Sequence, residues 1–366
     1  MLLISICVIC ILLNVFYGST RQRKMLTPQG ETRIVTAKEV LIMFALILIV
    51  TSTLRYGFID TYAYKIMYRE SRDNLDYVNS APWGVEAGWL YLMYLLNFIT
   101  DSPKLMLFLV ALAVNVAYVL MCKKYSSNVL FSLFVYFCIG YMDTNNGLRQ
   151  CFAASITTMA FPLLLRRRYV WYALLVAFAS LFHESAIYVL LIALLVLGRP
   201  FNLKMFIALL ACVVFLFAPE SISGFIKESI LDSKYNDYLN YSVGMSFLRC
   251  FIISILPLAL AVLYCINKQG KKEKISYQDG VLINMLIMNS VFYLMGMYMQ
   301  YWARLAFYTS FAPIVLLPKL IDGVFVKSDR AWIKPVALCL YFIFFAYNIY
   351  VNIAYGAMRD FRIEWF

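Results

Sequence analysis

Charged residues are scarce in this chain. Lysine, arginine, aspartate and glutamate make up 14% of its 366 residues, whereas a soluble domain has about 25%. Hydrophobic residues make up 63%, which is more than a soluble fold can bury, and no polar stretch is long enough to link two domains. These deficits exclude a soluble multidomain protein and predict a single transmembrane domain over residues 1–366.

Histidine is nearly absent, since His183 is the only one. None of the nine cysteines stands at metal-ligand spacing from it, and all lie in or at the ends of apolar segments, so we expect free, buried thiols. The sequence also has no glycine-rich phosphate loop and no Ser-His-Asp pattern. We therefore expect neither a metal nor another cofactor. The aromatic residues (17%) are too diffuse to indicate a nucleic-acid-binding surface.

Apolar segments of membrane-spanning length dominate the chain. A spanning helix needs about 20 apolar residues, with a lower limit near 17. We predict an all-α polytopic membrane protein with about twelve transmembrane helices, near residues 2–17, 37–54, 104–122, 127–142, 149–165, 169–183, 185–198, 204–218, 247–266, 280–298, 304–318 and 335–353. The segment at 88–99 is apolar but shorter, which favours an interfacial or re-entrant helix.

Basic residues stand in short loops between these segments. The net charge of +12 would suggest nucleic acid in a soluble protein, but this distribution follows the positive-inside rule. With the cluster at 21–24 placed inside, every basic cluster except the C-terminal tail falls on the inner side. Both termini and two larger segments, 55–103 and 219–246, are then outside. The inner loops are short, so any chemistry is expected in the membrane or on its outer side.

Four arginines contradict this rule because they stand on the predicted outer edge, namely Arg55, Arg149, Arg249 and Arg304. Each needs a partner at that depth. Arg149 and Arg304 open apolar helices, whose free N–H groups and dipole favour anions, and a guanidinium can bind a phosphate through two hydrogen bonds. The alternatives are snorkelling to lipid phosphates and, for the turn before Arg149, helix capping by Asp143 or Asn146.

His183 lies at the outer boundary between two apolar segments, where an ionisable residue suggests a function. With a reference pKa near 6.5, an imidazole can accept a proton from a hydroxyl at neutral pH. Glu184 either orients it or faces water. Asp60 and Glu86 are the competing candidates for a catalytic base. Candidates for contacts with sugar hydroxyls are Tyr62, Tyr64, Asn146 and Gln150, although the tyrosines also fit an interfacial aromatic belt.

Four short motifs occur in order on the predicted outer side: Arg55…Asp60…Tyr62/Tyr64, Glu86-x-Gly88, Asn146-Gly147-Leu148-Arg149-Gln150 and His183-Glu184-Ser185-Ala186. In these motifs the chain resembles the EpsG family, which comprises Wzy-like membrane proteins of bacterial exopolysaccharide, capsule and O-antigen loci. The resemblance covers about residues 50–190, and beyond them it rests on hydropathy and Arg304. Glu184 stands where the family more commonly has a basic residue, so no charge-dependent role carries over to it.

The resemblance implies an enzyme that joins lipid-linked oligosaccharide repeat units at the outer face of the bacterial inner membrane. The donor would be a glycan on undecaprenyl diphosphate, and the acceptor a sugar hydroxyl on a second lipid-linked unit. A GT-C-like glycosyltransferase architecture and a chain-length regulator protein as a further partner are compatible with it. On this hypothesis Arg149 and Arg304, together with Arg55 or Arg249, hold the diphosphate, and His183 is the base of an inverting, metal-independent transfer.

Two alternatives remain open. An O-antigen ligase or a related glycosyltransferase would share the arginines and differ in its acceptor. A lipid-linked oligosaccharide flippase should carry charges near the bilayer midplane, and often broken helices or internal repeats. Here the predicted midplane positions are almost purely apolar and the charges cluster at one end, which favours outer-face chemistry over transport.

Overall fold

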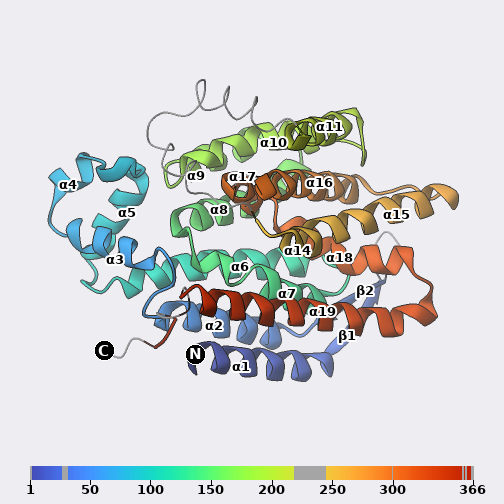
Figure 1. Cartoon of the computed structure of the whole chain (residues 1–366), viewed down its shortest axis with the longest axis horizontal. Helices are drawn as coiled ribbons and strands as arrows, with labels where there is room; N and C mark the ends of the chain where they lie inside the picture. Colours follow the sequence, from blue (N-terminus) through green and yellow to red (C-terminus); the bar gives the residue numbers. More distant parts are fainter. Residues whose placement is uncertain are drawn as a thin grey trace.

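The computed structural model describes residues 2–26, 32–217, 245–298, 300–356, 358 and 361–363, without the side chains of 215–217, 300 and 301. Within this part of the chain, the secondary structure is helical except for one two-stranded hairpin. Figure 1 shows the long helices running roughly parallel to one another. A helix satisfies its own backbone hydrogen bonds, as a membrane interior requires, and the predicted all-α class is confirmed.

The hairpin was not predicted. Helix α1 (Leu2–Ser19) leads into strands β1 (Gln22–Leu26) and β2 (Thr32–Thr36), which pair antiparallel before helix α2 (Lys38–Leu54) begins. The Ile34 N–H donates to the carbonyl of Ser127 (2.7 Å), so the hairpin joins the turn between two later helices. Its sequence looked like a basic loop because these strands are short and the docking that stabilises them is non-local.

The predicted outer segment 55–103 forms several short elements: α3 (Thr61–Glu70), α4 (Leu75–Asn79), a 3₁₀ turn (Pro82–Gly84) and α5 (Ala87–Asn97). Figure 1 shows α3, α4 and α5 gathered at the end of the bundle opposite the hairpin. Helix α5 is the short helix expected near 88–99. A Cβ at Gly88 would lie 2.4 Å from the carbonyl oxygen of Leu181, so glycine allows α5 to pack directly against the chain after residue 180.

The remaining helices follow in order: α6 (Lys104–Tyr125), α7 (Val129–Ile139), α8 (Leu148–Leu165), α9 (Tyr169–Ser180), α10 (Tyr188–Val196), α11 (Leu203–Phe217), α14 (Phe247–Cys250), α15 (Leu256–Gly270), α16 (Tyr277–Tyr298), α17 (Gln300–Leu305), α18 (Phe311–Val324) and α19 (Lys327–Ala354). A π-helical stretch, Phe251–Ile255, joins α14 to α15. Most of the other predicted outer segment, 219–246, lies outside the described residues.

Six described helices are long and apolar enough to cross a membrane: α1, α6, α8, the continuous helix Phe247–Gly270, α16 and α19. The bent pair Trp302–Tyr308 and Phe311–Val324 provides a seventh if it is one span. Shorter apolar helices occupy several other predicted spans, so the count of twelve stays a prediction.

The predicted span 304–318 is a helix broken by 70°. The break lies at Thr309 and Ser310, and Thr309 stands four residues before Pro313. A proline has no N–H to donate to the carbonyl four residues earlier, and its ring clashes with that carbonyl. A continuous helix through residue 309 is therefore disfavoured.

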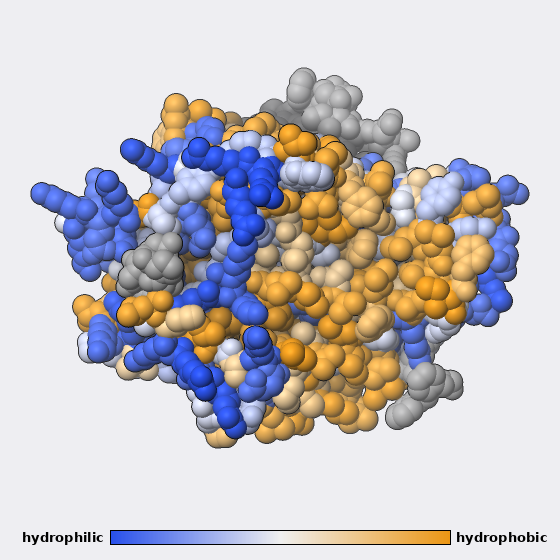
Figure 2. Space-filling model, turned by 180° about the vertical axis from the view of Figure 1, so that it is seen from behind, coloured by the Kyte–Doolittle hydropathy of each residue, from blue (hydrophilic) through white to orange (hydrophobic). Residues whose placement is uncertain are grey.

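Helices α6, α8 and α16 are mostly enclosed by their neighbours, whereas α1 and α19 expose most of their surface. Figure 2 shows an apolar band between two hydrophilic ends of the molecule, as expected for a protein embedded in a bilayer. Of the nine free cysteines six are buried, but Cys339 on α19 is exposed, so the expectation of burial was wrong at that position.

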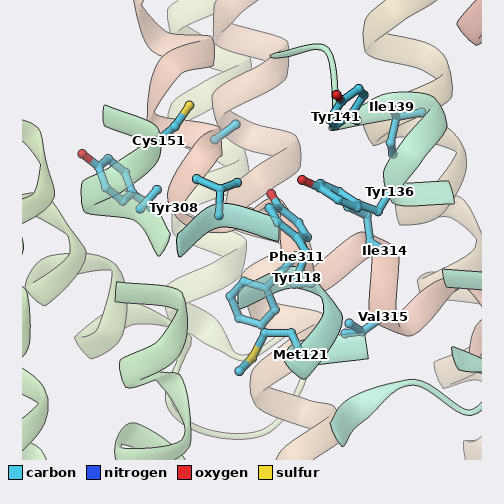
Figure 3. Close-up of a cluster of buried hydrophobic side chains, with 14 of the residues drawn as sticks. Tyr118, Met121, Tyr136, Ile139, Tyr141, Cys151, Tyr308, Phe311, Ile314 and Val315 are labelled. Atoms are coloured by element: carbon cyan, nitrogen blue, oxygen red, sulfur yellow. The ribbon is translucent and has the colours of Figure 1, made fainter. Parts of the chain in front are cut away.

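Several neutral polar groups inside the bundle form hydrogen bonds with one another. Figure 3 shows Tyr118 beside Tyr136, with ring centroids 4.0 Å apart in a stacked arrangement. The Tyr136 hydroxyl donates to Asn115 Oδ1 (2.9 Å), and the Tyr118 hydroxyl lies 2.5 Å from the hydroxyl of Ser310. These contacts link α6 to α7 and to the break before α18.

Candidate functional site

The turn at 143–147 is the point where several distant segments meet. Asp60 Oδ2 accepts a hydrogen bond from the Gly147 N–H (2.7 Å), and the Arg55 guanidinium donates to the carbonyl of Asn145 (3.2 Å). Arg249 forms an ion pair with Asp143. The turn therefore connects the chain after α2, the start of α8 and helix α14.

Gly147 has a backbone conformation that this turn requires. Its φ is +62°, in the left-handed region, and it stands directly before the first residue of α8. An L-residue with a side chain is disfavoured there. The conformation of Gly147 thus determines where α8 begins. It also determines the direction of the Gly147 N–H, which donates a hydrogen bond to Asp60.

Glu86, which directly precedes α5, contacts three groups. Its Oε1 lies 2.8 Å from His183 Nδ1 and accepts a hydrogen bond from the Glu184 N–H (3.0 Å). Its Oε2 forms an ion pair with the guanidinium of Arg149. The side chains of all three partners in this Arg149–Glu86–His183 cluster are mostly buried. The cluster brings together residues from three of the four predicted motifs.

The electrostatics of Glu86 favour its ionised form. Burial alone would raise its pKa, but the hydrogen bond with His183 and the charge of Arg149 outweigh burial and lower the pKa to about 2. An ionised Glu86 favours the tautomer of His183 in which Nδ1 carries the proton and donates a hydrogen bond to the carboxylate. The free lone pair of the imidazole is then on Nε2. Glu86 is therefore suited to orient the imidazole and is a weak base itself.

Asp60 has the opposite electrostatic environment. Burial raises its pKa to about 6, although the Gly147 N–H and the charges of Arg55 and Arg304 act in the lowering direction. Its Oδ1 is buried and has no hydrogen-bond partner among the described residues. A carboxylate with this pKa near charged groups is suited to accept a proton near neutral pH.

The four arginines that were predicted to lie on the outer edge have different surroundings. Arg149 pairs with Glu86, and Arg249 pairs with Asp143. Arg304 is exposed and its charge acts on Asp60. The Arg55 side chain is different because the residue is only 1% exposed and its guanidinium donates to the carbonyls of Ser52 and Asn145. Arg55 is thus placed to hold the turn at 143–147.

The four residues considered for sugar contacts are dispersed. Tyr64 is buried, and burial together with the charge of Asp60 raises the pKa of its hydroxyl, whereas Arg149 acts in the lowering direction. Gln150 Nε2 donates to the carbonyl of Arg304 (2.9 Å), which ties α8 to α17. Tyr62 is 67% exposed. The carbonyl of Asn146 accepts the Cys151 thiol (3.2 Å), so its contact with α8 is through the backbone.

Two contributions to the site were missed in the sequence. Asp143 was considered only as a helix cap, yet it pairs with Arg249. The Tyr308 hydroxyl lies 2.8 Å from the hydroxyl of Ser185, next to the His183 turn. Asp143 could have been suspected because an unpaired arginine at membrane depth needs an acidic partner. Nothing in the sequence marks Tyr308 among the chain's 28 tyrosines.

The fold and these contacts define a multi-pass helical membrane protein with a cluster of paired ionisable groups at one end of its bundle. Among known families, the model of the EpsG family matches residues 39–360. The chain belongs to the EpsG family, and the resemblance seen in four motifs is confirmed over a much longer stretch. Membership associates the protein with bacterial polysaccharide biosynthesis and a polymerase-type role. No curated protein and no solved structure matches the chain.

Proposed function

We propose that the protein is a polysaccharide polymerase of the bacterial inner membrane, acting at the outer face. It transfers a glycan from undecaprenyl diphosphate to a sugar hydroxyl on a second lipid-linked repeat unit. The observation that carries this proposal is the Arg149–Glu86–His183 cluster. In this cluster an imidazole and a guanidinium contact the same carboxylate, at the end of the bundle that gathers the family motifs, and this supports the roles of base and anion-binding group.

In the proposed reaction, His183 Nε2 takes the proton of the acceptor hydroxyl as its oxygen attacks the anomeric carbon of the donor. The bond between that carbon and the diphosphate oxygen breaks, and the diphosphate leaves with the electron pair. Direct displacement inverts the anomeric centre, with the base on the acceptor's side as in inverting glycosidases. The ionised Glu86 holds Nδ1–H and stabilises the imidazolium that forms.

The leaving diphosphate is assigned to Arg149, Arg249 and Arg304. A guanidinium has five N–H donors, and an ion pair with one carboxylate leaves several of them for phosphate oxygens. Arg149 Nε, for example, has no hydrogen-bond partner among the described residues. Fixed positive charges at the leaving group stabilise the transition state without reorganisation. Arg55 acts indirectly, because its buried guanidinium holds the turn that carries Asp143.

The proposal is tested by chain growth in a purified system. Wild-type protein would receive lipid-linked repeat units extracted from the bacterium that makes the polysaccharide, and the products would be sized on a gel. Arg149→Ala and His183→Ala are expected to lower chain growth about 100-fold or more. The matched control is Arg72→Ala, which removes an exposed arginine paired with Asp101 at the same end and is expected to change the rate less than about twofold.

The same assay separates the alternatives. A ladder of products that both substitutions leave intact would refute the site. Transfer of a single glycan to a different acceptor, without a ladder, would indicate a ligase. Translocation of the lipid without any chain growth would refute the polymerase and support a flippase.

A further inference from the structure

A short segment after α19 returns to the end of the bundle that carries the site. Its residues 361–363, which we call the strap, follow directly after the range that the EpsG family model matches. Ile363 pairs with Arg55 in an antiparallel bridge, and the Tyr56 N–H donates to the carbonyl of Arg362 (2.7 Å). The strap is thus bound through its backbone to the chain that leaves α2.

Two side chains of the strap reinforce this pairing. The Phe361 ring is completely buried and packs edge-on against Phe58, with ring centroids 5.7 Å apart. The Arg362 guanidinium lies over the ring of Tyr56, 4.9 Å from its centroid. Edge-to-face aromatic pairs and cation–π contacts are both favourable. Because Arg362 is exposed and Phe361 is not, Phe361 is the main anchor of the strap.

Phe58 begins the tight turn that contains Asp60. The buried Thr61 hydroxyl donates to the Phe58 carbonyl (2.8 Å) and accepts from the Phe58 N–H (3.1 Å). Within the turn, Ile59 has a φ of +48°, a conformation that is unfavourable for a β-branched residue. Its side chain is 57% exposed, so its own packing does not hold it there. Such a conformation persists only where the surroundings fix it, and the strap contributes to this through Phe58.

Asp60 and Arg55 connect the strapped segment with the turn before α8. Asp60 accepts a hydrogen bond from the Gly147 N–H, and the Arg55 guanidinium donates to the carbonyl of Asn145. That turn leads directly into α8, whose second residue is Arg149. Two separate hydrogen bonds therefore link the chain that the strap holds to the chain that positions Arg149.

We propose that Phe361 is a positioning residue of the site, anchoring a strap that fixes the turn before α8 through Asp60 and Arg55. For the reaction itself, the inference rests on the proposed function, in which Arg149 binds the leaving diphosphate. A guanidinium stabilises a developing charge best when it is already held in place. The site then depends on a residue that lies outside the four sequence motifs and outside the range matched by the family model.

Amide hydrogen exchange tests this inference without a need for chain growth. Purified wild type and Phe361→Ala would be compared in detergent by mass spectrometry of peptides that cover residues 55–61 and 143–149. We expect exchange in both stretches to be about tenfold faster in Phe361→Ala. The reason is that the N–H groups of Tyr56 and Gly147 lose acceptors that the strap holds in place.

Three comparisons make the result specific. Tyr355→Ala is the matched control, because it removes a ring that is 86% exposed at the end of α19, and it should leave both stretches unchanged. Phe361→Leu keeps most of the apolar volume and should restore slow exchange. The hairpin β1–β2, at the opposite end of the bundle, should exchange at the wild-type rate in every variant. Phe361→Val replaces Phe361→Ala if the latter does not fold.

Three outcomes would overturn the inference. Exchange that is unchanged in both stretches, or faster in 55–61 alone, would show that the strap does not fix the turn before α8. Faster exchange throughout the bundle, the hairpin included, would make Phe361 an ordinary core residue. In the gel assay, chain growth should fall about tenfold in Phe361→Ala and recover in Phe361→Leu, and a wild-type rate in Phe361→Ala would refute the role in the site. A failure of the proposed function is distinct, because it appears as a lack of chain growth in the wild type.

Discussion

At the scale of single residues, the proposed chemistry depends most on Glu86, which contacts both Arg149 and His183. The sequence located His183, Arg149 and Glu86 at one end of the molecule, because alternating helices with basic inner loops assign every turn to a side. It could not show that one carboxylate contacts both of the other residues, since this depends on the packing of α5 against the end of α9. The contact makes Glu86 suited to orient His183, the base of the proposed reaction.

Asp60 provides a prediction on pH dependence. Its folded-state pKa is raised from 3.8 to about 6, so the folded state binds the proton more tightly than the unfolded state. Stability is therefore greatest below about pH 4, falls as the pH rises from 4 to 6 and reaches its full loss above pH 6. Asp60→Asn is expected to be more stable than wild type above pH 6, by about 3 kcal/mol at most, and equal to it near pH 4, as measured by thermal unfolding.

The control for this prediction is Asp101→Asn, which changes an exposed aspartate at the same end and should not alter stability in that pattern. A lower stability of Asp60→Asn than wild type at pH 8 would contradict the raised pKa. Because His183 is assigned as the base, Asp60→Asn should retain more chain growth than His183→Ala. A loss equal to that of His183→Ala would transfer the role of base to Asp60.

At the scale of elements, hydropathy predicted most of the helices but not the features that shape them. The hairpin β1–β2 was missed because its strands are short and are held by a contact with Ser127. The break before α18 was missed because Pro313 lies within a continuous apolar run. The turn at 143–147 was recognised by its polar residues, but its left-handed glycine is a property of the backbone.

Gly147 provides a prediction at this scale. Gly147→Ala forces a side chain into the left-handed region (φ +62°) and is expected to lower stability by about 1 kcal/mol. Chain growth should also fall, because the backbone N–H of residue 147, which donates a hydrogen bond to Asp60, is displaced. The matched control is Gly270→Ala, at a helix end with open space around its Cβ position. Equal thermal stability and chain growth in the two variants would contradict this role of the turn.

At the scale of the whole molecule, the site exists only in the assembled bundle. Glu86 comes from the segment before α5, Arg149 from the start of α8 and His183 from the turn after α9. The four arginines predicted to lie on the outer edge all lie at this end of the structure, close to Asp60, Glu86 or Asp143. The gathering of these charged residues at one end of the molecule was therefore predictable from the sequence, whereas the particular ion pairs that they form were not.

The most direct test of the account is chain growth by purified Glu86→Gln, which preserves the size of the side chain and removes its charge. The account predicts a folded protein whose rate of chain growth falls about 100-fold or more, because His183 loses the anion that orients it and stabilises its protonated form. The control Glu70→Gln, an exposed glutamate at the end of α3, should keep the wild-type rate. Elongation by Glu86→Gln at the wild-type rate would contradict the central role of the Arg149–Glu86–His183 cluster.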